Sequence, residues 1–490
     1  MAKQKSEPGP GHRGQPATLV ALAAGVAIAC LAAPAAANPF DLHGLGSRGA
    51  AMAGANTASA RDYAGVYYNP ATMVLSPPCA GAGGFFTANE LQIRLAERPA
   101  GYDNPDDDDS HIGVGYLLND RADPPTPASS AFIEIGATSA LGSDAFRVGF
   151  VAALPLASSV PARSVFSDER QQYFSNTLQF DLLGVRVEHA TILFAAARRF
   201  TPWLSIGAGL SYMPSTRTTN EAYLADPLNP GRMDLNVGLE IPASIKPTAG
   251  LLLTPLPGLN LALAYRAEQK MAFTGTTTVQ LLGSHDDPAV ADAYPFKQPM
   301  NIVMNYTPTQ VALGAAGTLG DTELNLDAVW SQWSNFVDNH DHRPGFNDTW
   351  SLRLGAEQKL GEANWLRAGF GWEPTPVPDM RGRYNYVDND RVVASGGMGR
   401  DFALGGSKVR MGVHAQFQGL IERSVTKRAA AAYPACGSDD SLICDESPDV
   451  PVTPGAPPGN PGLQTANPGF PGWSSGGWLA SFGIDATWSF

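Results

Sequence analysis

Two groups of side chains in this sequence are of residue types that can bind a metal ion. Asp106-Asp107-Asp108-Asp109 is a run of carboxylates, the ligands that Ca²⁺ prefers, and His340-Asp341-His342 sets two imidazoles around a carboxylate. The first run lacks the glycine and glutamate spacing of a calcium loop, so we expect a solvated acidic segment. The second has no further ligands near it. No serine lies in a nucleophile elbow, so the sequence predicts no catalytic residue, metal site or cofactor.

Four arginines lie on the polar, lumen-facing side of segments whose residues alternate in polarity. They are Arg266, Arg353, Arg367 and Arg410. Each could meet the carboxylate of a ligand through a charge-assisted hydrogen bond. Each could instead pair with an acidic side chain of a polar wall, as we expect for Arg353 and Glu357. Local pairing is the simpler expectation, and contact with a ligand stays open as the alternative.

The first 37 residues have the three parts of a secretory signal peptide. Basic residues precede an apolar stretch, 17–33, and Ala35-Ala36-Ala37 provides a small-residue cleavage site. We therefore expect an exported chain that begins at Asn38. Lipid attachment at Cys30 is a weaker alternative, because alanine stands where such sites usually have leucine.

Export permits disulfide bonds, and three cysteines remain in the expected mature chain. Cys436 and Cys444 lie close together in a stretch rich in Gly, Pro and Asp, so they are the expected pair. Cys79 is expected to be a free, buried thiol.

The composition excludes several classes of protein. Of 490 residues, 44% are hydrophobic and 16% are charged, with 52 Gly and 40 Pro. Beyond the first forty residues no apolar run approaches the ~20 residues of a spanning helix. A net charge of −13 argues against nucleic acid as a partner. An all-β protein with many turns remains.

From Gly81 onward, segments of about ten residues alternate in polarity, as strands do. In 478–490, Trp478, Phe482 and Ile484 share one face, while the other is mostly polar. The first face suits lipid and the second a polar lumen. The terminal Phe490 is expected to be an assembly signal that the barrel-assembly machinery reads.

Short and long connections alternate strictly between these segments. The six short ones lie near residues 142–144, 200–202, 254–258, 320–322, 361–364 and 405–407. The seven long ones are expected at about 96–131, 155–177, 214–233, 275–308, 334–349, 374–397 and 422–477. Thirteen connections imply fourteen strands, and this alternation is typical of an outer-membrane barrel with periplasmic turns and extracellular loops. The sequence therefore predicts a 14-stranded antiparallel β-barrel in the bacterial outer membrane, over residues 81–490.

Residues 38–80 precede the first strand and show no sustained strand alternation. The segment is rich in Gly and Ala, has short helical possibilities, and contains Asn69-Pro70-Ala71. Such a segment suits a compact plug, or hatch, packed closely against the barrel wall.

With this motif, the sequence resembles the FadL/TodX family of outer-membrane transporters of hydrophobic compounds. The resemblance also rests on the segments 203–210, 327–336, 354–357, 366–370 and 374–379, which follow in the family's order. It implies a hatch-plugged barrel that carries long-chain fatty acids or other hydrophobic compounds, such as aromatic hydrocarbons, inward by diffusion. It also implies a lateral exit at a kink in the third strand. Pro155 would mark that kink, or it would only begin the following loop.

Two other functions stay open at this point. One is a barrel enzyme that modifies lipids at the loop rim, and the other is an adhesive or structural barrel that binds a partner through the Pro-rich loop at about 422–477. The expected surroundings are outer-membrane lipid and lipopolysaccharide.

Overall fold

The structure is a computed structural model that describes the chain from residue 39 to 489 with gaps. The described residues are 39–96, 126–140, 142–158, 178, 180, 182–183, 191–213, 216–224, 233–241, 243–281, 296–337, 343–380, 384–404, 407–428, 469 and 471–489.

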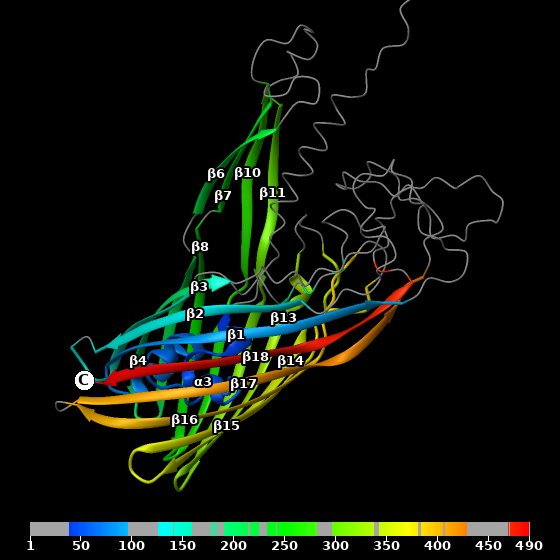
Figure 1. Ribbon diagram of the computed structural model, residues 1–490. Helices are drawn as coiled ribbons and strands as arrows, with labels where there is room; N and C mark the ends of the chain where they lie inside the picture. Colours follow the sequence, from blue (N-terminus) through cyan, green and yellow to red (C-terminus); the bar gives the residue numbers. More distant parts are fainter. Residues whose placement is uncertain are drawn as a thin grey trace, which may run out of the picture.

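Fourteen strands form a closed antiparallel barrel (Figure 1). They are β1 (Cys79–Leu95), β2 (Thr126–Ser139), β3 (Phe146–Ser158), β4 (Thr191–Thr201), β5 (Leu204–Met213), β8 (Ser244–Leu256), β9 (Leu259–Arg266), β12 (Thr309–Leu319), β13 (Thr322–Gln332), β14 (Thr349–Leu360), β15 (Asn364–Glu373), β16 (Arg391–Leu404), β17 (Ser407–Thr426) and β18 (Gly472–Ser489). Strand β1 pairs with both β2 and β18, which closes the sheet. The predicted 14-stranded barrel is confirmed. Closure matters because lipid offers no partner for an unpaired strand edge.

The two faces of the wall differ in polarity as the alternation predicts. In β18 the side chains of Phe482 and Trp488 are more than half exposed on the outer face, while Ser481 and Thr487 are buried on the inner face. Apolar side chains project outward in the same way from β5, β14 and β17. The outer face is the lipid-facing belt, and the inner face lines a polar lumen.

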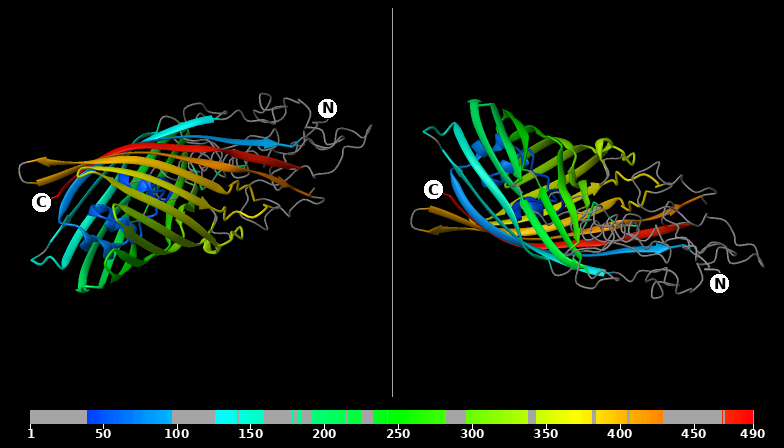
Figure 2. Two further views of the ribbon diagram at one scale, coloured as in Figure 1. Left: turned by 90° about the horizontal axis from the view of Figure 1, so that it is seen from below. Right: turned by 90° about the horizontal axis from the view of Figure 1, so that it is seen from above.

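The short connections and the carboxyl end of the chain lie at the same end of the barrel (Figure 2). Several of these turns have a glycine with positive φ, such as Gly258 at 82° and Gly320 at 62°. A left-handed backbone is strained for residues with a Cβ, which explains glycine at these turns. With this end in the periplasm, the opposite end, which bears the long connections, is extracellular.

The segment before β1 forms the hatch inside the barrel, drawn in blue in Figures 1 and 2. It contains the short helices α2 (Pro39–His43), α3 (Gly46–Ala51) and α4 (Gly65–Tyr68), and the 3₁₀ turns η1 (Asp62–Ala64) and η2 (Pro70–Leu75). Helix α3 packs against β15 to β18, and η2 packs against β4, β5 and β8. The hatch thus reaches across the lumen. Among the described residues, no helix is both long and apolar enough to cross a membrane.

A second, four-stranded sheet extends four wall strands beyond the loop end of the barrel (Figure 1). Its strands are β6 (Thr216–Leu224), β7 (Met233–Ile241), β10 (Gln269–Leu281) and β11 (Phe296–Thr307). The expectation of polar loops at 214–233 and 275–308 is therefore wrong over much of their length. The threonine-rich runs in 216–219 and 276–278 favour strands, and this propensity prevails once neighbouring strands offer hydrogen bonds.

Candidate functional site

Asn69 of the Asn-Pro-Ala motif joins the hatch to the barrel wall. Its Oδ1 atom accepts a hydrogen bond from the Ala71 amide at 3.0 Å, which caps the turn η2. Its Nδ2 atom donates to the carbonyl oxygens of Thr57 in the hatch and Leu251 in β8, both at 3.1 Å. One buried amide therefore shapes the turn and holds it against the wall, as expected of a fully satisfied buried polar group.

The barrel wall has glycines at the positions where the Asn-Pro-Ala motif packs against it. A Cβ atom at position 207 in β5 would lie 2.5 Å from the backbone of Pro70 and Ala71, and one at position 250 in β8 would lie 1.9 Å from Asn69 Oδ1. Any larger residue would push the hatch away, so glycine at these two positions permits the close approach.

Carboxylates of the wall hold the backbone of the hatch. Asp327 in β13 accepts hydrogen bonds from the amides of Asn56 and Thr57, both at 2.8 Å. Asp485 in β18 accepts one from the amide of Ser47 at 2.8 Å. Charge-assisted bonds of this kind are stronger than neutral ones. The hatch is thereby fixed to two wall strands that lie five strands apart around the barrel.

A buried ion-pair cluster also links the hatch to the wall. Arg48 of α3 contacts Glu323 in β13 at 2.6 Å and Glu357 in β14 at 3.1 Å. Arg61 of the hatch contacts the same two carboxylates. Arg367 in β15 completes the cluster, with its Nε atom 2.6 Å from Glu357 Oε2. Because Glu357 is occupied here, the expected pair of Arg353 with Glu357 is wrong.

Arg353 pairs instead across the strands β14 and β15. Its Nη2 atom lies 2.8 Å from Glu373 Oε1, and Arg391 contacts the other carboxylate oxygen of Glu373 at 2.7 Å. Arg266 pairs with Asp41 of α2 at 3.0 Å and stacks on the ring of Tyr67 at 4.2 Å. These two predicted arginines lie on the extracellular side of the hatch.

Arg410 lies at the opposite side of the hatch. It forms a bidentate pair with Asp401, with distances of 2.6 and 3.0 Å, and it lines a cavity of about 680 Å³ below the hatch. We call this cavity the periplasmic vestibule. Its lining includes the charged side chains of Arg61, Asp62 and Glu323 as well as apolar surface.

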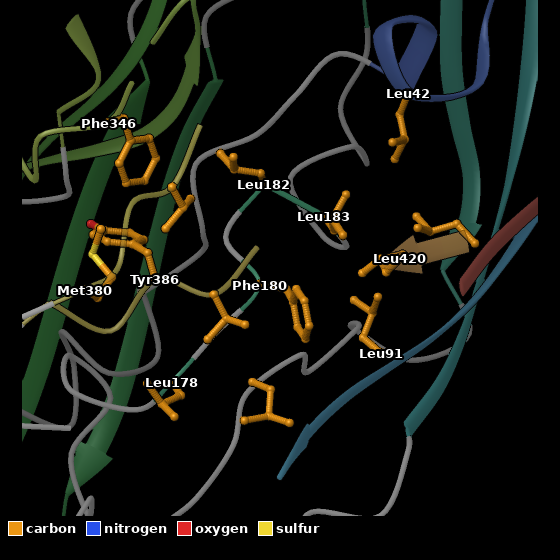
Figure 3. Close-up of a cluster of buried hydrophobic side chains, with 14 of the residues drawn as sticks. Leu42, Leu91, Leu178, Phe180, Leu182, Leu183, Phe346, Met380, Tyr386 and Leu420 are labelled. Atoms are coloured by element: carbon orange, nitrogen blue, oxygen red, sulfur yellow. The ribbon is translucent and has the colours of Figure 1, made fainter. Parts of the chain in front are cut away.

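A large cluster of buried apolar side chains lies above the hatch, among the loops and the extracellular strand ends. We call it the apolar cluster, and Figure 3 shows part of it. Its members are Leu42, Phe85, Leu91, Ile93, Phe132, Leu178, Phe180, Leu182, Leu183, Tyr306, Phe336, Phe346, Val377, Met380, Tyr386, Val387, Leu420, Val425, Trp473 and Leu479. Leu42 comes from the hatch, so the cluster has the hatch as its floor.

Three aromatic rings form the rigid side of the apolar cluster. Phe336 and Phe346 stack with their centroids 4.3 Å apart, and Tyr386 meets Phe346 edge-on at 5.3 Å. Sequence reasoning missed Phe346 and Tyr386 because they fall in predicted loops. Large aromatic residues are unusual in solvated loops, so their presence in these two predicted loops was the sequence signal that could have indicated a buried cluster.

A small polar pocket of about 70 Å³ opens at the base of the apolar cluster. Its lining combines Leu42, Leu182 and Trp333 with polar residues, namely Asp41, Gln310, Ser331, Thr349, Ser351, Arg353, Glu373, Asp388 and Arg391. The Nε atoms of Arg266, Arg353 and Arg391 are buried and have no hydrogen-bond partner among the described residues. Unused donors of this kind suit water or the polar end of a ligand.

The wall is irregular around Pro155. This residue lies within β3 opposite Phe132 of β2, and the register shifts there, so that Leu156 forms a bulge. Strand β3 pairs with β4 from Phe146 to Ala153, while Leu154 to Ser158 extend beyond Thr191, the first described residue of β4. A proline at a bulge fits, because it lacks the amide that a regular ladder requires.

Several predicted residues lie outside the part of the chain that the structure describes. They are Phe490, the cysteines Cys436 and Cys444, the acidic run 106–109, and 340–342. Cys79 is confirmed as a free, buried cysteine. Within the described residues, no three or more His, Cys, Asp or Glu side chains are grouped to hold a metal ion.

Comparison with known proteins gives a family match, a related sequence and a similar fold. The model of a family described as outer membrane protein transport protein (OMPP1/FadL/TodX) matches residues 184–428, half of the chain. Over 188 residues the chain is 24% identical to alkane uptake protein A of Marinobacter nauticus, and the match covers 35% of this chain and 40% of that protein. The chain's fold is similar to the crystal structure of a Pseudomonas aeruginosa FadL homologue. The TM-score is 0.57 at 14% identity, over 91% of this chain and 98% of the other.

Proposed function

Because the chain belongs to the outer membrane protein transport family (OMPP1/FadL/TodX), we propose that it carries hydrophobic compounds inward across the outer membrane. The apolar cluster above the hatch is the observation that carries this proposal. An apolar compound gains roughly 0.8 kcal/mol for each CH₂ group that leaves water. Capture among such side chains therefore needs no chemical energy, and transport proceeds by diffusion.

The polar pocket at the base of the apolar cluster supports a proposal about how a substrate with a polar end is oriented. A substrate with a polar end would lie with its chain among the apolar side chains and its polar end near Arg353, close to Arg266. The unused Nε donors of these arginines support this orientation. Arg367 and Arg410 are committed to ion pairs in or below the hatch, so wall pairing is their proposed role.

The proposed exit is lateral, through the wall near Pro155, into the membrane. The irregular register between β2 and β3 at Pro155 supports it. The periplasmic vestibule, whose lining includes Arg61, Asp62 and Glu323, supports it as well, because an apolar compound would lose the free energy of burial on entering water there. Uptake that is unchanged after replacement of Pro155 and its neighbours would contradict this route.

Uptake by a deletion strain tests the transport function. Cells with and without the gene would be compared for growth on, and uptake of, oleate, a toluene-like aromatic and a long-chain alkane. The alkane is included because alkane uptake is part of the name of the Marinobacter nauticus relative. We expect faster uptake of at least one compound with the gene. Equal uptake of all three in both strains would contradict the proposal.

The same proposal makes the barrel a transporter rather than a lipid-modifying enzyme. A lipase assay on the folded protein tests this, and hydrolysis of lipid by the pure protein would contradict it. We also propose lipopolysaccharide around the extracellular rim and assembly by the barrel-assembly machinery through Phe490. A variant that lacks the loop at about 422–477 helps to separate transport from the adhesive alternative. We expect this variant to retain uptake, because the proposed route does not use that loop.

A further inference from the structure

Two arginines interrupt the lipid-facing belt of the barrel near its periplasmic end. Arg198 in β4 lies opposite Ile206 in β5, and Arg400 in β16 lies opposite Met411 in β17. Ile206 is 44% exposed and Met411 is 42% exposed, so both partners face outward. The two arginines, which are themselves exposed, therefore stand on the outer, lipid-facing side of the wall.

Each arginine is stacked on a phenylalanine two residues further along its strand. The Cζ atom of Arg198 lies 5.3 Å from the ring centroid of Phe200, and that of Arg400 lies 5.4 Å from the ring centroid of Phe402. Both rings are exposed on the same outer face. Each Arg-x-Phe group stands just before a short periplasmic turn, so the same arrangement occurs twice. Cation–π contact fixes the plane of each guanidinium and leaves its N–H donors free.

Neither guanidinium forms a hydrogen bond or an ion pair with another described residue. The acidic neighbour of Arg400 in the sequence, Asp401, faces the lumen and pairs there with Lys408 and Arg410. Arg199, next to Arg198, also faces inward and bonds to the carbonyl oxygen of Val74. The outward arginines thus differ from these lumen-facing arginines, which bond to carboxylates or carbonyl oxygens of the wall and the hatch.

We propose that Arg198 and Arg400 bind the phosphate groups of phospholipids in the periplasmic leaflet. At this depth the surrounding molecules are lipids, and phosphate is the headgroup anion that a guanidinium recognises with paired hydrogen bonds. The phenylalanine next to each arginine lies nearer the periplasmic turn, at the level of the aromatic girdle of outer-membrane barrels, and the arginine side chain extends over its ring towards the lipid headgroups. The two arginines lie on separate strands, β4 and β16, and their contacts with lipid fix the depth of the barrel in the membrane.

Lipid retention by the full-length protein tests the proposal. The protein would be purified in detergent, titrated with phosphatidylglycerol, and examined by native mass spectrometry for bound lipid. We expect Arg198→Gln and Arg400→Gln each to weaken binding about fivefold, since one arginine near an anionic membrane surface contributes roughly that factor. Arg94→Gln is the matched control, because Arg94 is an exposed arginine at the extracellular end of β1, hydrogen-bonded to Gln92.

The outcomes are distinct. Retention of the wild-type affinity by the double variant would overturn the proposal, and so would an equal loss in Arg94→Gln. Phe200→Leu with Phe402→Leu keeps both charges, and a partial loss of binding is expected because the guanidinium planes are no longer fixed. Heat-modifiable migration on gels verifies that each variant is a folded barrel.

Discussion

A Cβ atom at position 250 would lie 1.9 Å from the Oδ1 atom of Asn69, so Gly250 and Asn69 fit together only because glycine has no side chain. This contact joins β8 of the wall to the Asn-Pro-Ala turn of the hatch. The position of the hatch therefore depends on a wall residue far away in the sequence, next to Leu251, whose carbonyl oxygen accepts a hydrogen bond from Asn69.

Gly250→Ala is expected to displace the Asn69 side chain and loosen the hatch. Overpacking of this kind costs about 1–3 kcal/mol. Hydrogen exchange of hatch amides, followed by mass spectrometry, should show faster exchange around Asn69. Gly317→Ala in β12 is the matched control, because a Cβ atom there would meet nothing within 4 Å. Equal protection of the hatch in both variants would contradict the role of Gly250.

Arg48→Met is expected to release the hatch from β13 and β14. It leaves Glu323 and Glu357 with fewer positive partners in a buried place, and breaking such a pair costs about 3–5 kcal/mol. Ion conductance in planar bilayers should rise as the lumen opens. Arg423→Gln breaks an ion pair with the exposed Asp379 and should change conductance little. A conductance of Arg48→Met equal to that of the wild type would show that the ion pairs do not hold the hatch closed.

Phe346→Ala is expected to weaken capture of hydrophobic compounds. It removes the ring stacked on Phe336 and opens the rigid side of the apolar cluster. Loss of a buried phenylalanine typically costs about 3–5 kcal/mol of stability, so the variant must first be shown to fold. Uptake at low substrate concentration is the measurement. Phe370→Ala removes an aromatic ring that is 50% exposed on the lipid-facing side and should leave uptake unchanged.

His43→Gln is expected to make the hatch less sensitive to acid. Burial, together with the neighbouring His414, lowers the pKa of His43 from its ordinary 6.5 to about 3. The unfolded segment therefore binds a proton between these values while the folded hatch does not. The stability of the hatch falls as the pH drops below about 6.5 towards 3.

Hydrogen exchange of the hatch at pH 4 and pH 7 would measure this effect. Asp62 acts in the opposite sense, because burial raises the pKa of its carboxyl to about 6 and favours the protonated, folded form. The difference between wild type and His43→Gln isolates the histidine. A pH dependence that is identical in the two proteins would refute the prediction.

The sequence by itself determined the barrel and its orientation. Alternating polarity and connection length are local properties, so the outward faces in β18, the six short turns and the fourteen strands could be derived from them. The Gly- and Ala-rich segment 38–80, which lacks strand alternation, indicated the hatch, and the resemblance supported it through the Asn-Pro-Ala motif. The second sheet was missed because polar, threonine-rich segments become strands only when a neighbouring strand provides partners.

The tertiary structure alone decided which charges meet and where the apolar cluster forms. Arg353 pairs with Glu373 rather than Glu357, because Glu357 is already shared by Arg48, 309 positions away, and by Arg367. Phe346 and Tyr386 gather with Leu42 only when two loops and the hatch converge. Such contacts depend on closure of the barrel around the hatch, and no local pattern in the chain encodes the partner of a side chain hundreds of residues away.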